Sequence, residues 1–205
     1  PPALLTLSFL SSALEAKGYK TDEVLKTYQM LYQSGFCTYP RTEDKFVTPD
    51  QFDQMLPLID KIAGLVGVNH KELTHRTPRK THVKEGGVHG ANRPGKNVPN
   101  NLQELSQFGP SAIDIYVLLS RNYLATLAED YEYEQQKANL AEYPDYTSSI
   151  SVPKRMGWKS IYSDVSIDEE NEDVKSFGRT ADPFIHEGFP PKPAQPTMKW
   201  LMTQL

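Results

Sequence analysis

The sequence predicts an α+β protein, with a helical N-terminal part followed by a β-rich part. Up to about residue 130, apolar residues recur at helical spacing, as in Val24, Tyr28 and Leu31. Beyond that point "YEYEQQKANLAEY" and "YTSSISVPKRMGWKSIY" show alternation and β-branched residues, which favour strands. We therefore place a domain boundary near residue 130, between domains at 1–130 and 131–205.

The first two helices follow from their start and stop signals. Thr6 or Ser8 can cap a helix that runs to about Lys17. Thr21 can cap a second helix, and Gly35 is the residue type that ends one. Two helices joined by a tight turn are typical of a helix-turn-helix or winged module.

A short strand over 36–39 is expected after the second helix. Thr48 or Asp50 can cap a third helix that extends to about Val66, with Pro57 inside it as a kink. A fourth helix is expected over about 111–130.

Two stretches carry unbalanced charge. Residues 69–101 are irregular and rich in Gly, Pro, Asn, His and basic residues, which in a compact domain indicates a functional or disordered loop. Lys84 and Lys96 belong to this basic stretch, which can hold phosphates even on an acidic protein. The segment 164–176 is acidic and is expected to be a solvated, flexible loop.

The bulk composition bounds the class of protein. The chain has 205 residues, a net charge of −4 and a single cysteine, Cys37, which fits a reducing cytoplasm rather than a disulfide framework. No stretch approaches the length of a transmembrane helix. The first residues lack both an initiator methionine and a signal peptide, so we expect the chain to be a fragment of a longer protein.

The stretch "GFCTYPRTED" contains a candidate nucleophile, Tyr39. Pro40 biases Tyr39 toward extended backbone, in which residues two apart point to the same side, so Arg41 is expected to face the same ligand. A phenol has an ordinary pKa of about 10, so it needs help to attack at neutral pH. A neighbouring guanidinium can favour the phenolate, grip a phosphate and offset charge in the transition state.

A second constellation, "HGANRPG", lies in the basic irregular stretch. Its His89 can donate to a phosphate oxygen or move a proton, and Arg93 follows four residues later. The spacings of His70, His75, His82 and His89 match no zinc motif, so no metal site is predicted in this chain.

Together these residues resemble the type IA DNA topoisomerases, including bacterial topoisomerase I and topoisomerase III-like enzymes. Tyr39, Arg41 and Thr42 match the family's Tyr-x-Arg-Thr/Ser-Asp motif, and "HGANRPG" is similar to its His-x-Ala-x-Arg-Pro-Thr block. A "PP-apolar-T" lead-in opens the chain, and a similar "PPKPAQPTMKWLMTQL" closes it. The departures are Glu43 for the usual Asp, Gly90 for an acidic residue or histidine, and Gly95 for Thr.

The resemblance implies a tyrosine-bearing domain of winged-helix or CAP-like type over 1–130, followed by part of a β-rich gate or arch domain. Tyr39 would be the nucleophile that cleaves one DNA strand through a 5′-phosphotyrosine, and Arg41 would stabilise the phosphate. The DNA contacts would include Thr42, Lys84, His89, Arg93 and Lys96.

The family's Mg²⁺ ligands lie in a Toprim domain, and no Asp-x-Asp-x-Asp occurs here, so this fragment is expected to bind no cofactor and to be inactive alone. The implied protein is a cytoplasmic isomerase that prefers single-stranded DNA, acts as a monomer, has no membrane partner and relaxes negative supercoils. Two alternatives stay open: a non-catalytic winged-helix DNA-binding module, and a structural or protein-interaction domain without DNA contact.

Overall fold

The computed structural model describes residues 1–162, 177–178, 180 and 188. Its contacts divide the chain into two compact units, one containing Pro1–Glu129 and the other beginning at Asp130. Five α-helices occur in the first unit and a two-stranded antiparallel sheet in the second, as far as the described residues extend. The predicted mixture of helix and strand is confirmed, whereas the winged-helix assignment stays a prediction.

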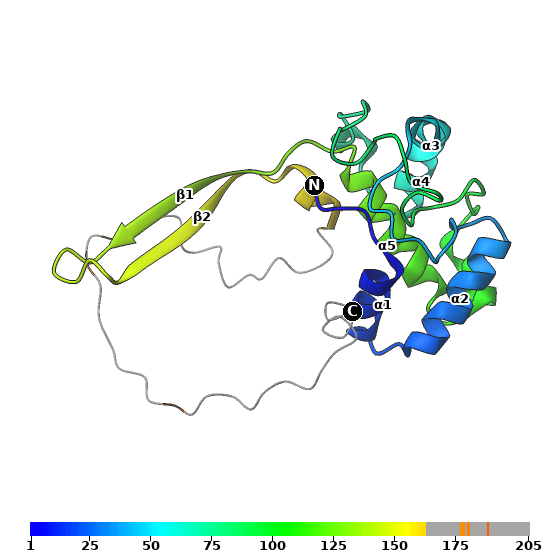
Figure 1. Cartoon of the computed structure of the whole chain (residues 1–205), viewed down its shortest axis with the longest axis horizontal. Coiled ribbons are helices and arrows are strands. Elements are labelled where there is room, and N and C mark those ends of the chain that lie inside the picture. The colour runs from blue at the N-terminus through cyan, green and yellow to red at the C-terminus, as the bar shows by residue number, and fades with distance from the viewer. Residues whose placement is uncertain (163–176, 179, 181–187, 189–205) are drawn as a thin grey trace. The chain divides into compact units, whose positions relative to one another are not determined.

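Helix α5 (Ala112–Ala125) forms the centre of the helical unit, and α1, α2 and α4 pack against it (Figure 1). Its residues Ile115, Tyr116, Leu119 and Leu124 are fully buried. Burying one such aliphatic side chain contributes about 1.5–3 kcal/mol, so this helix supplies much of the core beneath the candidate site. The helix ends before the predicted residue 130, in a turn over Thr126–Ala128.

The first two helices lie where the sequence places them, with one change in capping. Helix α1 spans Leu7–Glu15 after an extended Thr6, and α2 spans Thr21–Gln33. The N-cap of α2 is Lys20, because Thr21 already has helical backbone and its hydroxyl donates to Glu15. The prediction that Thr21 caps α2 was therefore wrong by one residue.

The third predicted helix is interrupted at its proline. Helix α3 (Pro49–Met55) starts from a capping box in which the side chains and main chains of Thr48 and Gln51 bond to each other. A 3₁₀ turn at Leu56–Leu58, which contains Pro57, then leads into α4 (Ile59–Leu65). Proline lacks the N–H that a continuous helix needs, which explains the break.

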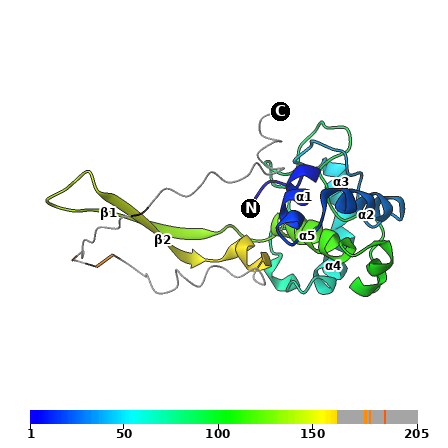
Figure 2. The ribbon, with the colours of Figure 1, turned by 90° about the horizontal axis from the view of Figure 1, so that it is seen from below.

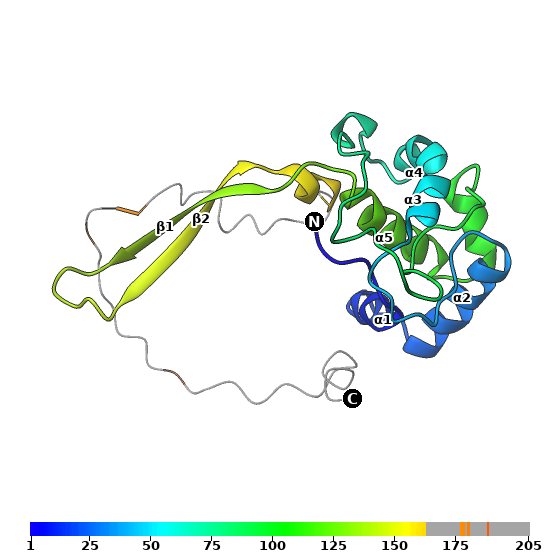
Figure 3. The same cartoon turned by 45° about the horizontal axis from the view of Figure 1, so that its top comes forward.

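The long stretch between α4 and α5 is irregular, as predicted, but it is tied to the rest of the unit (Figure 3). It contains two 3₁₀ helices, His70–Glu72 and Leu102–Phe108. Three isolated bridges attach nearby segments to one another: Leu5–Asn92, Cys37–Pro94 and Val47–Val83. The stretch is therefore an ordered part of the helical unit.

The described residues of the second unit form one hairpin (Figure 2). Strand β1 (Glu132–Asn139) pairs with β2 (Thr147–Arg155), and Lys154 and Arg155 form ion pairs with Glu134 and Glu132 across it. The second predicted strand is too long, because Gly157–Tyr162 forms a 3₁₀ helix. The acidic segment 164–176 and the second Pro-Pro stretch at 190–205 lie outside the described residues.

Candidate functional site

The backbone before Tyr39 is held by pairing with the "HGANRPG" segment. Gly35, with a φ of +75°, ends α2, and the Gly95 N–H then donates to the Phe36 carbonyl at 2.7 Å. The Thr38 N–H donates to the Arg93 carbonyl at 3.1 Å. The predicted strand over 36–39 is therefore wrong as regular structure. The segment is extended, but the described residues pair it through one isolated bridge rather than a ladder.

Asn92 fixes the main chain of Tyr39 itself. Its amide oxygen accepts the Leu7 N–H, and its amide nitrogen donates to the Tyr39 carbonyl and to the Tyr28 hydroxyl, each at 2.9 Å. The side chain is completely buried. Because a buried amide without partners would be costly, this residue specifies one arrangement of α1, α2 and the tyrosine.

The Tyr39 ring lies between two other rings and is half-buried. Its centroid is 4.7 Å from that of His89, with a 49° tilt, and 5.5 Å from that of Tyr32, which meets it edge-on. The structure gives the phenol oxygen no hydrogen-bond partner among the described residues. Tyr39, the predicted nucleophile, and His89, a predicted DNA contact, therefore lie together, and the phenol oxygen is unengaged among the described residues.

Asp44 holds the loop that carries His89. Its Oδ2 accepts the N–H groups of Val88, His89 and Gly90 at 3.2, 3.3 and 2.9 Å. Gln51, from the capping box of α3, donates to the His89 carbonyl at 3.2 Å. Successive N–H groups form a concavity that suits an anion, and here the anion is the Asp44 carboxylate.

Two of the three departures from the family pattern, Gly90 and Gly95, have local explanations. Gly90 has a φ of +70°, and a Cβ there would lie 2.1 Å from Oε1 of Gln51. A Cβ on Gly95 would lie 2.2 Å from the Gly35 carbonyl oxygen. Both glycines allow the close approach that brings His89 to Tyr39.

The cations predicted to contact DNA lie in three different settings. Arg41 is exposed and has no hydrogen bond or ion pair within the part of the chain that the structure describes. Lys96 is exposed beside the paired segment, and exposed Lys84 lies 4.4 Å from the Phe46 ring centroid. All three are accessible to a phosphate.

Arg93 and Thr42, in contrast, are buried, with 7% and 5% exposure. Little of either side chain is exposed for the predicted direct contact with DNA, and for Arg93 the cause is that residues 91–95 are all buried. The Arg93 guanidinium donates to the Ala91 carbonyl at 3.1 Å, and its Nε has no partner. Burial lowers the pKa of Arg93, although the nearby Tyr123 and Tyr28 hydroxyls oppose that shift. Thr42 instead accepts the Asp44 N–H at 3.1 Å.

Three residues of the site escaped sequence reasoning: Asp44, Gln51 and Asn92. The Thr-x-x-Gln capping pattern at 48–51 was a readable signal for Gln51 as a capping residue, though not for its bond to His89. Asp44 and Asn92 act through partners distant in sequence, so no local pattern indicates them.

Within the described ranges, no three His, Cys, Asp or Glu side chains gather in a way that could hold a metal ion. No helix among the described residues combines the length and the apolar character that crossing a bilayer requires.

Comparison with known proteins shows the family of this chain. A family model described as DNA topoisomerase matches residues 1–190. The chain therefore belongs to the DNA topoisomerase family and is a relative of its type IA members.

Several curated relatives carry a more specific name. DNA topoisomerase 3 of Bacillus subtilis is 28% identical over 183 residues, which cover 84% of this chain and 24% of that protein. DNA topoisomerase 3 of Bacillus cereus is 30% identical over 188 residues, covering 85% and 25%. Human DNA topoisomerase 3-beta-1 is 27% identical over 177 residues, covering 78% and 19%. The chain thus spans about a quarter or less of the length of these relatives.

Proposed function

We propose that this chain is the nucleophile-bearing part of a type IA DNA topoisomerase. The phenol oxygen of Tyr39 attacks a phosphodiester of one DNA strand, forming a bond to phosphorus as the bond to the 3′ oxygen breaks. The phenol proton leaves, and the departing 3′ oxygen takes up a proton. The contact between Tyr39 and His89, beside an unengaged phenol oxygen, is the observation that supports this proposal best.

His89 and Arg41 have complementary roles in this reaction. The exposed imidazole of His89 can donate to a phosphate oxygen or take up the phenol proton. The Arg41 guanidinium, which is free to bind, offsets the charge that develops on the phosphate oxygens. Lys84 and Lys96 bind neighbouring phosphates, and buried Arg93 and Thr42 support the site from behind.

The covalent ester conserves the energy of the phosphodiester bond, so passage of another strand and religation by the 3′ hydroxyl need no ATP. We propose a preference for single-stranded DNA, action as a monomer, and relaxation of negatively supercoiled DNA. We propose that the full-length enzyme uses Mg²⁺ and that the ligands of this ion lie in a Toprim domain outside this chain.

The test is a Tyr39→Phe substitution in the full-length enzyme. We expect covalent adducts with a labelled single strand to disappear, while non-covalent binding changes by less than about twofold. Tyr32→Phe is the matched control, because its ring contacts Tyr39 but has no proposed chemical role. Adducts that persist in Tyr39→Phe would contradict the proposal. Binding by a wild-type enzyme that never forms adducts would favour the non-catalytic DNA-binding module.

A further inference from the structure

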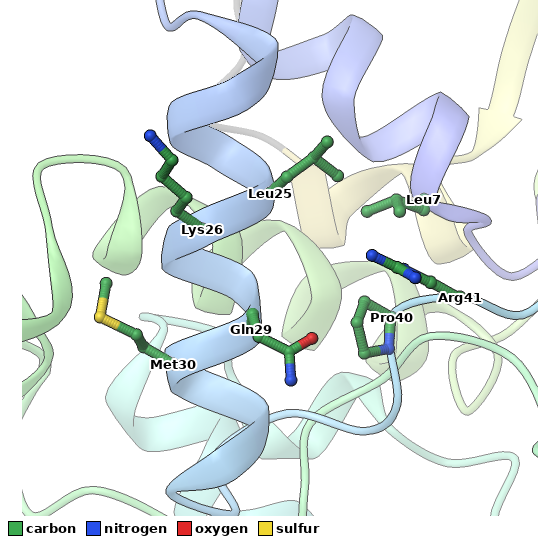
Figure 4. Close-up of a pocket in the computed structure, with 7 residues that line it drawn as sticks. All are labelled: Leu7, Leu25, Lys26, Gln29, Met30, Pro40 and Arg41. Carbon is green, nitrogen blue, oxygen red and sulfur yellow. The ribbon is translucent and has the colours of Figure 1, made fainter.

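A groove lies next to the tyrosine, between the start of α1, one side of α2 and the Pro40–Arg41 segment (Figure 4). Its volume is about 620 Å³, which is in the range of small-molecule sites. Figure 4 shows Leu7, Pro40 and Arg41 opposite Leu25 and Gln29, whereas Lys26 and Met30 project from the other side of α2. These seven residues line the groove.

The groove combines apolar walls with positive charge. Leu25 and Met30 are each 40% exposed, although they are large apolar side chains on a helix that buries its other face. Arg41 and Lys26 are the charged lining residues, and among the residues that the structure describes no acidic side chain lines the groove. A nucleotide carries a flat base with apolar faces joined to an anionic phosphate, so its chemistry is complementary to this lining.

The groove adjoins the nucleophile through both the main chain and α2. Pro40 and Arg41 in its wall directly follow Tyr39. Gln29, also in its wall, precedes Tyr32 by one turn of α2, a rise of about 4.5 Å. Because Tyr32 contacts Tyr39, a strand whose phosphate lies at Tyr39 has a neighbouring nucleotide within reach of the groove.

We propose that this groove is a subsite for the nucleoside next to the phosphate that Tyr39 attacks. The base packs against Leu25 and Pro40, its edge bonds to the Gln29 amide, and Arg41 binds its phosphate. This inference depends on the proposed function, since it takes the DNA strand to lie at Tyr39.

The test measures equilibrium binding of the purified chain to two fluorescent oligonucleotides, a thymidine 12-mer and an abasic 12-mer with the same phosphates. Leu25→Ala should weaken binding of the thymidine 12-mer about three- to tenfold and leave the abasic 12-mer unchanged. Leu140→Ala is the matched control, because Leu140 is 39% exposed and lies in the hairpin unit. It should change neither affinity.

A second pair of variants locates the strand on α2. Gln29→Glu places a negative charge in the groove and should weaken binding of both oligonucleotides. Gln33→Glu places the same charge on an exposed position of the same helix outside the groove and should have a smaller effect.

The inference is overturned if Leu25→Ala behaves like Leu140→Ala, if it weakens both oligonucleotides equally, or if the chain binds neither. None of these outcomes affects adduct formation by Tyr39, so failure of the subsite is distinguishable from failure of the proposed function.

Discussion

The rings of Tyr39 and His89 lie 4.7 Å apart between centroids, although they belong to distant segments of the chain. Two sets of hydrogen bonds bring them together. Residues 35–38 pair with 93–97, and the Asp44 carboxylate gathers the N–H groups of Val88–Gly90. The site therefore depends on the irregular stretch as much as on the helices.

His89→Gln in the full-length enzyme should slow adduct formation by about 10²-fold, the lower end of what general acid–base groups contribute. Glutamine retains a hydrogen-bond donor but cannot move a proton at neutral pH. The measurement is the single-turnover rate of strand cleavage. His70→Gln, at an exposed position outside the site, should leave that rate unchanged. Equal cleavage rates for the two variants would show that His89 has no role in the reaction.

Asp44→Ala should loosen the His89 loop, because three N–H groups lose their common acceptor. We expect a loss of about 1–3 kcal/mol of local stability, measured as faster amide hydrogen exchange at residues 88–90. Glu43→Gln is the control, since exposed Glu43 has no partner among the described residues. Unchanged exchange in Asp44→Ala would show that the loop is held by other contacts.

Gly95→Ala should destabilise the helical unit by about 1–3 kcal/mol, because the added Cβ would meet the Gly35 carbonyl oxygen at 2.2 Å. Gly64→Ala offers the opposite case. Gly64 is an exposed residue of α4 with nothing within 4 Å of an added Cβ, so alanine should stabilise by about 0.5–1 kcal/mol. Chemical denaturation of the purified chain measures both, and a mild effect at Gly95 would contradict the tight pairing.

Arg93→Met tests why a cation is buried without a carboxylate partner among the described residues. Methionine fills similar space and removes the desolvation penalty, so the thermal midpoint should be unchanged or higher. Adduct formation in the full-length enzyme should fall, since the charge beneath the site is lost. A large fall in the midpoint would instead assign Arg93 a structural role.

The buried side chain of His82 should make the stability of the folded chain depend on pH. Burial lowers the pKa of His82, against a hydrogen bond to the Pro2 carbonyl that raises it. The folded chain therefore favours the neutral imidazole. The stabilisation is complete above the ordinary histidine pKa of about 6.5 and is lost as the pH falls through the lower folded value. Chemical denaturation between pH 5 and 8 should show a free energy of unfolding that falls as the pH falls. His82→Gln should make this dependence on pH weaker. An equal dependence in both proteins would show that His82 does not cause it.

Local signals in the sequence were sufficient to locate the helices and to single out the residues proposed to react. The Thr48 cap and the break at Pro57 follow from backbone chemistry that acts within a few residues. Tyr39 and His89 were found because their motifs are short and chemically distinctive.

Long-range contacts account for what the sequence left open. The roles of Asn92 and Asp44 depend on which segments pair, and the burial of Arg93 depends on the residues that cover it. The predicted strand at 36–39 failed for the same reason, because extended backbone forms a regular ladder only with a matching partner. Spacing within one segment carries none of this information.

The Asn92 amide has a mechanical consequence for the proposed reaction. By bonding to Leu7, Tyr28 and the Tyr39 main chain at once, it makes the tyrosine move together with its two flanking helices. A DNA end esterified to the phenol would then move together with the entire helical unit. The motion that separates the two broken ends has to pivot elsewhere, outside the segment that bears the tyrosine.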